Sequence, residues 1–124
     1  MSTLKTEKVK TTTIADELDT ESTAVTNVIN GSAKAWVNFR GTSTVAIRRD
    51  FNVSSLVDSG TGIYIVNFTT AMTDANYSTL VTCEQAEFAG MGSATTSSVT
   101  VYCVTRQDSL SRSDNAFMNV AVFR

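Results

Sequence analysis

The stretch AWVNFRG, residues 35–41, decides how the rest of this chain is interpreted. Ala35, Val37 and Phe39 alternate with other side chains, and this period of two is typical of a β-strand with one buried face. Trp36 is the only tryptophan of the chain, and it falls on the face opposite that apolar stripe. The stretch therefore predicts a strand that packs one face into a core and turns Trp36 away from it.

Short runs with a similar alternation recur after this strand, separated by Gly, Asp and Asn. The sequence DSGTG, residues 58–62, predicts a hairpin turn, because its glycines supply the backbone angles that tight loops need. Residues 84–96 and 106–115 show little period and are expected to be surface loops that carry variable contacts. Besides residues 35–40, strands are expected at residues 44–48, 51–57, 63–69, 77–83, 98–105 and 116–124.

The predicted fold is all-β, an antiparallel β-sandwich of jelly-roll type in residues 32–124. An extended N-terminal attachment arm, residues 1–31, precedes it, because that part of the chain is polar and offers few side chains to a core. Within the arm, residues 24–29 are rich in β-branched side chains and stop at the turn-forming pair Asn30-Gly31. A short strand that docks on a neighbour is expected there.

Composition limits the classes of partner. With 124 residues and 13.3 kDa, the chain fits one domain plus an arm. The net charge of −2 and the pI near 5.0 argue against nucleic acid, whose binding proteins concentrate Lys and Arg. The N-terminus lacks the apolar region of a signal peptide, and no stretch is apolar enough to span a membrane. We therefore expect folding in a cytosol, without membrane insertion.

The two cysteines, Cys83 and Cys103, both lie in expected strands. Two are too few for a disulfide framework, and a reducing compartment keeps cysteines as thiols. Small buried thiols are the interpretation that we favour, and a bridge between them stays open if their strands are neighbours.

Catalysis has few candidate residues in this sequence. The chain contains no histidine, which removes the commonest general base and the commonest metal ligand. Neither a Ser-His-Asp triad nor a zinc site built from two cysteines is available, so no catalytic residue, metal or cofactor is expected. Glu84 and Glu87 are the pair of carboxylates that a glycan-degrading enzyme would need, although two acids on one loop are usually just solvated.

The expected strand at residues 63–69 is apolar on both faces in its first part. Such a strand is either central in a sandwich or covered by another subunit. If subunits cover it, a homotrimer interface is expected at Ile63, Tyr64, Ile65, Val66, Val25, Val28 and Ile29.

The aromatic side chains Trp36, Tyr64, Tyr77 and Tyr102 have two interpretations. They can form a platform on which a sugar ring stacks, with hydroxyl and amide side chains bonding the sugar hydroxyls. They can also be aromatic side chains of the core or of a subunit interface, which is the interpretation that we favour.

Several blocks of the sequence resemble one family in the same order. They are Ala33-Lys34-Ala35-Trp36-Val37-Asn38-Phe39, Gly41-Thr42, Val45-Ala46-Ile47-Arg48, Phe51-Asn52-Val53-Ser54-Ser55, Gly60-Thr61-Gly62, Val66-Asn67-Phe68-Thr69-Thr70-Ala71-Met72, Asp74-Ala75-Asn76-Tyr77 and Val120-Ala121-Val122-Phe123-Arg124. They resemble a module of tail-fibre and other small virion proteins of bacteriophages, especially phages of cyanobacteria. Members of that family typically have Asn at the position of Arg40.

The resemblance implies a structural protein of the virion, assembled in the host cytoplasm. It implies a trimeric tail fibre or tail-associated adhesin that joins another virion protein through residues 1–31 and contacts a host-surface glycan or protein. The alternative is a capsid-bound head fibre or decoration protein, and a glycan-degrading tail enzyme is a third reading. The family supplies no catalytic residues to carry over.

Overall fold

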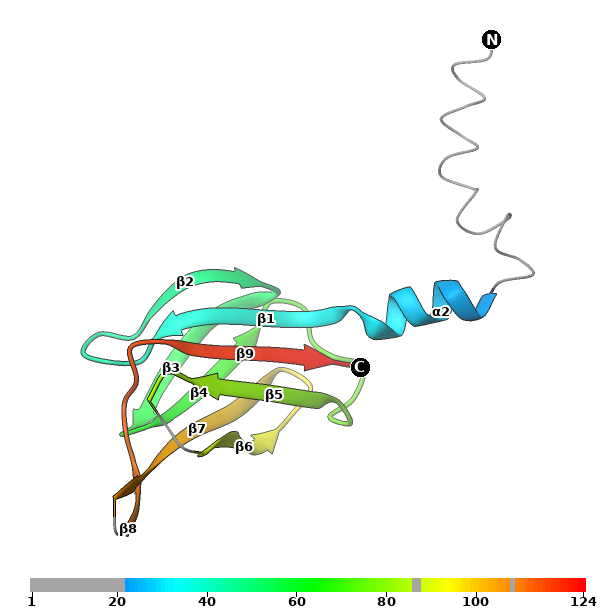
Figure 1. The fold of residues 1–124 in the computed structure, drawn as a ribbon. Coiled ribbons are helices and arrows are strands. Elements are labelled where there is room, and N and C mark those ends of the chain that lie inside the picture. Colours follow the sequence, from blue (N-terminus) through cyan, green and yellow to red (C-terminus); the bar gives the residue numbers. More distant parts are fainter. Residues whose placement is uncertain (1–21, 86–87, 108) are drawn as a thin grey trace. The chain divides into compact units, whose positions relative to one another are not determined.

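The computed structural model describes residues 22–85, 88–107 and 109–124 (Figure 1). Residues Ala33–Arg124 form one compact unit, here called the β-module, and the helix α2 (Ser22–Gly31) belongs to the unit before it. Most of the expected attachment arm, residues 1–21, lies outside the described residues.

The prediction of a strand at residues 24–29 is wrong, because these residues form part of α2. Val25, Val28 and Ile29 are spaced by three and four residues, which places them along one stripe of a helix. Gly31 ends the helix, and the Ser32 hydroxyl donates a hydrogen bond to the Val28 carbonyl in its last turn. The helical spacing therefore outweighs the β-branched composition.

The β-module is an antiparallel β-sandwich, which confirms the predicted fold class (Figure 1). Sheet A has the order β2-β1-β9-β5, and sheet B has the order β3-β4-β7-β6 with β8 paired to β7. The strands of sheet A are β1 (Ala33–Arg40), β2 (Ala46–Phe51), β5 (Ser78–Cys83) and β9 (Met118–Phe123). Those of sheet B are β3 (Val53–Gly60), β4 (Ile63–Phe68), β6 (Phe88–Ala94), β7 (Ser98–Gln107) and β8 (Ser109–Arg112).

Two expected loops contain regular structure instead. Residues 84–96 hold β6, and residues 106–115 hold the end of β7 and the whole of β8. β6 was missed in the sequence because Gly90 and Gly92 interrupt its alternation of apolar and polar side chains. At Gly90 an added Cβ would lie 3.3 Å from the Tyr102 hydroxyl, so the tyrosine of the neighbouring strand covers this glycine.

The core lies between the two sheets and draws on both. The inner face of β1 is as predicted, with Ala35, Val37 and Phe39 at 0–1% exposure, while Trp36 on the outer face is 38% exposed. The Phe39 and Tyr64 rings meet edge to face with centroids 5.2 Å apart. The other buried apolar side chains are Val53, Val66, Phe68, Met72, Val99, Val101, Cys103, Met118, Val120 and Val122.

The chain changes sheets between β2 and β3 at Asn52, which has a φ of 56°. Its side-chain amide donates to the Lys34 carbonyl at 3.0 Å and the Thr70 carbonyl at 3.1 Å, and its side-chain oxygen accepts from the Thr70 amide at 2.7 Å. Asparagine tolerates this left-handed conformation, and here its side chain also ties three segments together.

The hairpin predicted at residues 58–62 is confirmed, since β3 and β4 pair antiparallel across it. Gly60 and Gly62 have φ angles of 137° and 64°, which favour glycine. At Gly62 an added Cβ would also lie 2.7 Å from the Ser113 backbone nitrogen. This glycine is therefore required both by its conformation and by the approach of a second chain segment.

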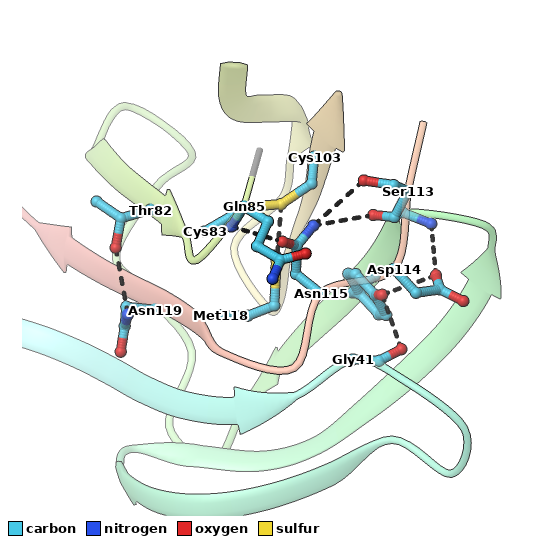
Figure 2. The surroundings of a disulfide bond; sticks show 12 residues. Gly41, Thr82, Cys83, Gln85, Cys103, Ser113, Asp114, Asn115, Met118 and Asn119 are labelled. Atoms are coloured by element: carbon cyan, nitrogen blue, oxygen red, sulfur yellow. Dashed lines mark hydrogen bonds between the residues drawn. A yellow bond between two sulfur atoms is a disulfide. The ribbon is translucent and has the colours of Figure 1, made fainter. Parts of the chain in front are cut away.

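The prediction that Cys83 and Cys103 are separate thiols is wrong. They form a disulfide that joins β5 in sheet A to β7 in sheet B, with their Cα atoms 6.7 Å apart (Figure 2). Cys103 is fully buried, as expected of a core residue, and its sulfur lies 3.0 Å from that of Met118. The bridge links two strands that do not pair, because they lie in different sheets.

Candidate binding surfaces

The outer face of sheet A carries two rows of side chains that the strand register places beside each other. In the first row Phe51, Trp36, Ala121 and Leu80 lie on four neighbouring strands, and three of them are large apolar side chains. Phe51 is 52% exposed and Leu80 is 61% exposed. We call these residues, together with the row described next, the Trp36 face.

The second row of the Trp36 face is polar and crosses the same strands, with Arg49, Asn38, Asn119 and Thr82 in register. The Asn38 amide donates to the Asn119 side-chain oxygen at 2.6 Å. The Asn119 amide donates in turn to the Thr82 hydroxyl at 3.3 Å, as Figure 2 shows. Residues two apart along a strand lie about 7 Å apart, so an amide row runs directly beside the aromatic row.

A groove of about 410 Å³ runs over the middle of this face. Trp36 and Asn38 line it from β1, Leu80 and Thr82 line it from β5, and the residues of β9 lie between them. Ala121 is the smallest side chain of the first row, so it leaves a depression between Trp36 and Leu80. The groove is thus an apolar slot with hydrogen-bonding groups at one end.

Sheet B has a larger hollow of about 970 Å³ on another part of the β-module. The Arg112 guanidinium on its wall stands 6.0 Å from the centre of the Tyr102 ring. Thr61, Ile63, Phe88, Val104, Ser111 and Arg112 line this hollow. It combines apolar walls with one cation.

The predicted interface residues of β4 divide between the two faces of sheet B. Tyr64 and Val66 point into the core and are 0% and 1% exposed, so they are not on a surface that a second subunit can reach, which corrects the prediction for these two. Ile63 and Ile65 point outward and are half-buried. Since β4 lies between β3 and β7, a central position explains why the strand is apolar on both faces.

The other predicted interface residues lie on α2. Val28 is 69% exposed, Ile29 is 56% exposed and Val25 is half-buried within the described residues. These three side chains form an apolar stripe on the helix.

The four aromatic residues of the sugar-platform interpretation do not come together. Tyr64 is in the core, and Tyr77 is half-buried against Phe68 with its hydroxyl donating to backbone carbonyls. Tyr102 is on the outer face of sheet B, whereas Trp36 is on sheet A. Of the four, Trp36 alone contributes to the Trp36 face.

Sequence reasoning missed the partners of Trp36, because Leu80, Thr82 and Asn119 come from strands far along the chain. The alternation of β5 and β9 does indicate that these side chains share an outer face. It does not indicate which residues stand opposite each other, since strand order and register decide that.

A buried polar network holds the loop before β9. The Tyr64 hydroxyl lies 2.9 Å from both the Gly41 carbonyl and the Asp114 carboxylate, which also accepts from the Gly62 amide at 2.8 Å. Burial, followed by the hydrogen bond with Asp114, raises the pKa of Tyr64 well above its ordinary value. These hydrogen bonds tie the hairpin at residues 58–62 and the loop before β9 to the end of β1.

Two arginine side chains elsewhere in the β-module have defined partners. The Arg124 guanidinium bonds both carboxylate oxygens of Asp74, at 3.2 Å and 2.7 Å, and lowers the pKa of that carboxyl group. The Arg48 guanidinium stacks 3.9 Å from the centre of the Phe117 ring. Of the pair considered for glycan hydrolysis, Glu84 is exposed and Glu87 lies outside the described residues.

Within the described residues, no three His, Cys, Asp or Glu side chains gather where a metal ion would be held. No helix in that part of the chain has the length and apolar character of a membrane span. Comparison with protein-family models, with curated proteins and with solved structures finds no match for this chain.

Proposed function

We propose that this chain is a structural protein of a bacteriophage virion, of the tail-fibre or tail-associated adhesin kind. Residues 1–31 join it to another virion protein, and the β-module is displayed toward the host surface. The order of sequence blocks between Ala33 and Tyr77, which resembles phage fibre proteins, supports the virion assignment. The role is attachment, and no catalytic step is part of it.

The observation that carries the adhesin role is the Trp36 face. A tryptophan that is 38% exposed, beside a leucine that is 61% exposed, leaves apolar area in water on a domain with an otherwise ordinary core. Aromatic side chains at such positions are enriched in binding surfaces, where they supply large contact area. A module held together by a disulfide and two sheets suits display outside a cell.

Localisation on the particle tests the virion assignment. Gold-labelled antibody against the β-module is expected to decorate the tail fibres or tail tip of purified phage. Labelling of the capsid instead would favour the alternative, a head fibre or decoration protein. Purified particles that contain none of this protein by mass spectrometry would refute the proposal as a whole.

The proposed oligomer is a homotrimer that uses the apolar stripe of α2. Val28 is 69% exposed on the helix, so a partner copy removes apolar surface from water there. Analytical ultracentrifugation of the full chain is expected to give a trimer, and the variant Val28→Glu a smaller species. Val57→Glu is the matched control, because Val57 is 45% exposed but lies on β3 of the β-module. A wild-type chain that stays monomeric at micromolar concentration would remove the trimer from the proposal.

A further inference from the structure

We infer that the groove of the Trp36 face binds one uncharged pyranose ring of a polysaccharide. The inference deepens the proposed function and rests on it for the source of the glycan, a host-surface polymer. Eight residues line the groove; the side chains of Val37 and Val120 are buried, and the other six are Trp36, Asn38, Leu80, Thr82, Asn119 and Ala121.

The shape of the groove fits a ring with apolar faces. A pyranose presents C–H groups on its faces and hydroxyl groups around its edge. Trp36 and Leu80 stand on β1 and β5, with the small Ala121 of β9 between them. Neighbouring strands lie about 4.8 Å apart, so the two walls are separated by about 10 Å at the backbone. A ring lying over Ala121 therefore contacts an aromatic side chain on one side and an aliphatic side chain on the other.

The polar end of the groove matches the edge of such a ring. The hydrogen bonds run in one direction, from the Asn38 amide to the Asn119 oxygen and from the Asn119 amide to the Thr82 hydroxyl. This direction leaves the Asn38 oxygen as an acceptor without a hydrogen bond from any described residue, and the Thr82 hydroxyl as a donor. Sugar hydroxyls act as donor and acceptor at once, so they satisfy both ends of the chain.

The absence of a charged side chain among the residues that line the groove favours a neutral sugar over an acidic one. None of the six groove side chains ionises. The Arg49 guanidinium belongs to the same polar row but lies on β2, the strand beyond Asn38. The hollow of sheet B, by contrast, has Arg112 in its wall. An uncharged groove favours a neutral hexose, because a carboxylate placed there would lose hydration without gaining a cation.

The unique tryptophan gives a direct measurement. Trp36 emission of the purified full chain is recorded while the methyl glycosides of glucose, galactose and mannose are added, with glucuronic acid as the acidic probe. At least one neutral glycoside is expected to change the emission saturably in the millimolar range, as for a single ring in a shallow site.

Two variants test which residues are responsible. Asn119→Ala removes the centre of the amide row and is expected to weaken binding about tenfold, since both remaining polar partners lose their alignment. Phe88→Ala is the matched control, because Phe88 is 51% exposed but lies in sheet B, and it is expected to leave binding unchanged. Amide signals of Asn38 and Asn119 in a nitrogen-15 NMR spectrum are expected to shift with the same midpoint.

Three results would overturn the inference. The first is an absence of saturable change with all neutral glycosides, and the second is a stronger response to glucuronic acid. The third is Trp36 emission that changes on dilution without sugar and is insensitive to Asn119→Ala, which would assign the face to a contact between copies. These outcomes are separate from virion localisation, so the inference and the proposed function can fail independently.

Discussion

At the scale of single residues, β1 shows how the alternation of a strand places one side chain in the core and the next on the surface. Phe39 is fully buried and meets Tyr64, whereas Trp36, three positions earlier, is 38% exposed on the other face. The burial of the strand was predicted from its period of two, and so was the outward position of Trp36.

Replacing each of these two aromatic residues by alanine is expected to have unequal effects. Phe39→Ala should lower the free energy of unfolding by about 3–5 kcal/mol, because it opens a cavity in the core. Trp36→Ala should cost less than about half of that, since its ring is partly in water already. Urea unfolding of both variants provides the comparison, and equal costs would contradict the exposure of Trp36.

The raised pKa of Tyr64 predicts that the protein becomes less stable at alkaline pH. Burial, and after it the hydrogen bond with Asp114, raise the pKa of Tyr64 in the folded protein, whereas a tyrosine in the unfolded chain has a pKa of about 10. The unfolded state therefore releases the proton first, and the free energy of unfolding is expected to fall as pH rises above about 10.

Urea unfolding between about pH 9 and 11.5, across the range in which free tyrosine titrates, checks this. Tyr64→Phe should be less stable at neutral pH, by about 1–3 kcal/mol for the lost buried hydrogen bond, and should fall less steeply. Part of the slope remains in that variant, because burial also raises the pKa of Tyr77. Parallel pH profiles for the two proteins would refute the assignment to Tyr64.

At the scale of elements, the disulfide between β5 and β7 is a covalent side-chain link between the two sheets. Its two cysteines are 20 positions apart, and closing a loop of that size stabilises a domain by about 3 kcal/mol. The bridge also holds the end of β5, which carries Thr82 and Leu80 of the Trp36 face.

Reduction is expected to lower the free energy of unfolding by about 2–4 kcal/mol. The measurement is urea unfolding with and without dithiothreitol, together with mass spectrometry to count free thiols. The double variant Cys83→Ala/Cys103→Ala serves as control, because its stability should not respond to dithiothreitol. A wild-type protein that is equally stable in both conditions would argue against a formed bridge.

At the scale of the whole molecule, the β-module is a unit with its own core. Every buried apolar side chain in the described residues comes from positions 35–122, and the module is compact from Ala33 onward. The described side chains of α2, residues 25–31, supply none of them, so the core of the β-module is built without these residues.

Deletion of residues 1–32 is therefore expected to leave a folded β-module with a cooperative thermal transition and an unchanged far-ultraviolet β-signal. Under the proposed function, the truncated chain should no longer join phage particles, which pull-down with purified particles would check. A truncated chain that is unfolded would contradict the independence of the module. One that still joins the particle would remove residues 1–31 from their proposed role as anchor.

The sequence by itself determined the properties that depend on residues close together along the chain. The alternation in β1 and β7 predicted strands, and the glycines of the turn at residues 58–62 predicted a hairpin; together they indicated the β-sandwich. Local signals failed where two patterns competed, as in α2, where helical spacing coexists with β-branched residues, and in β6, where glycines interrupt the alternation.

The tertiary structure alone decided which distant residues meet. Strand order and register bring Cys83 to Cys103 and Tyr64 to Asp114, its hydrogen-bond partner. They also align Trp36 with Ala121 and Leu80. A shift of one residue in a strand would turn its side chains to the other face of the sheet. Alternation is a property of one strand, whereas a binding surface needs several strands in a common register, and only the packed sandwich specifies that register.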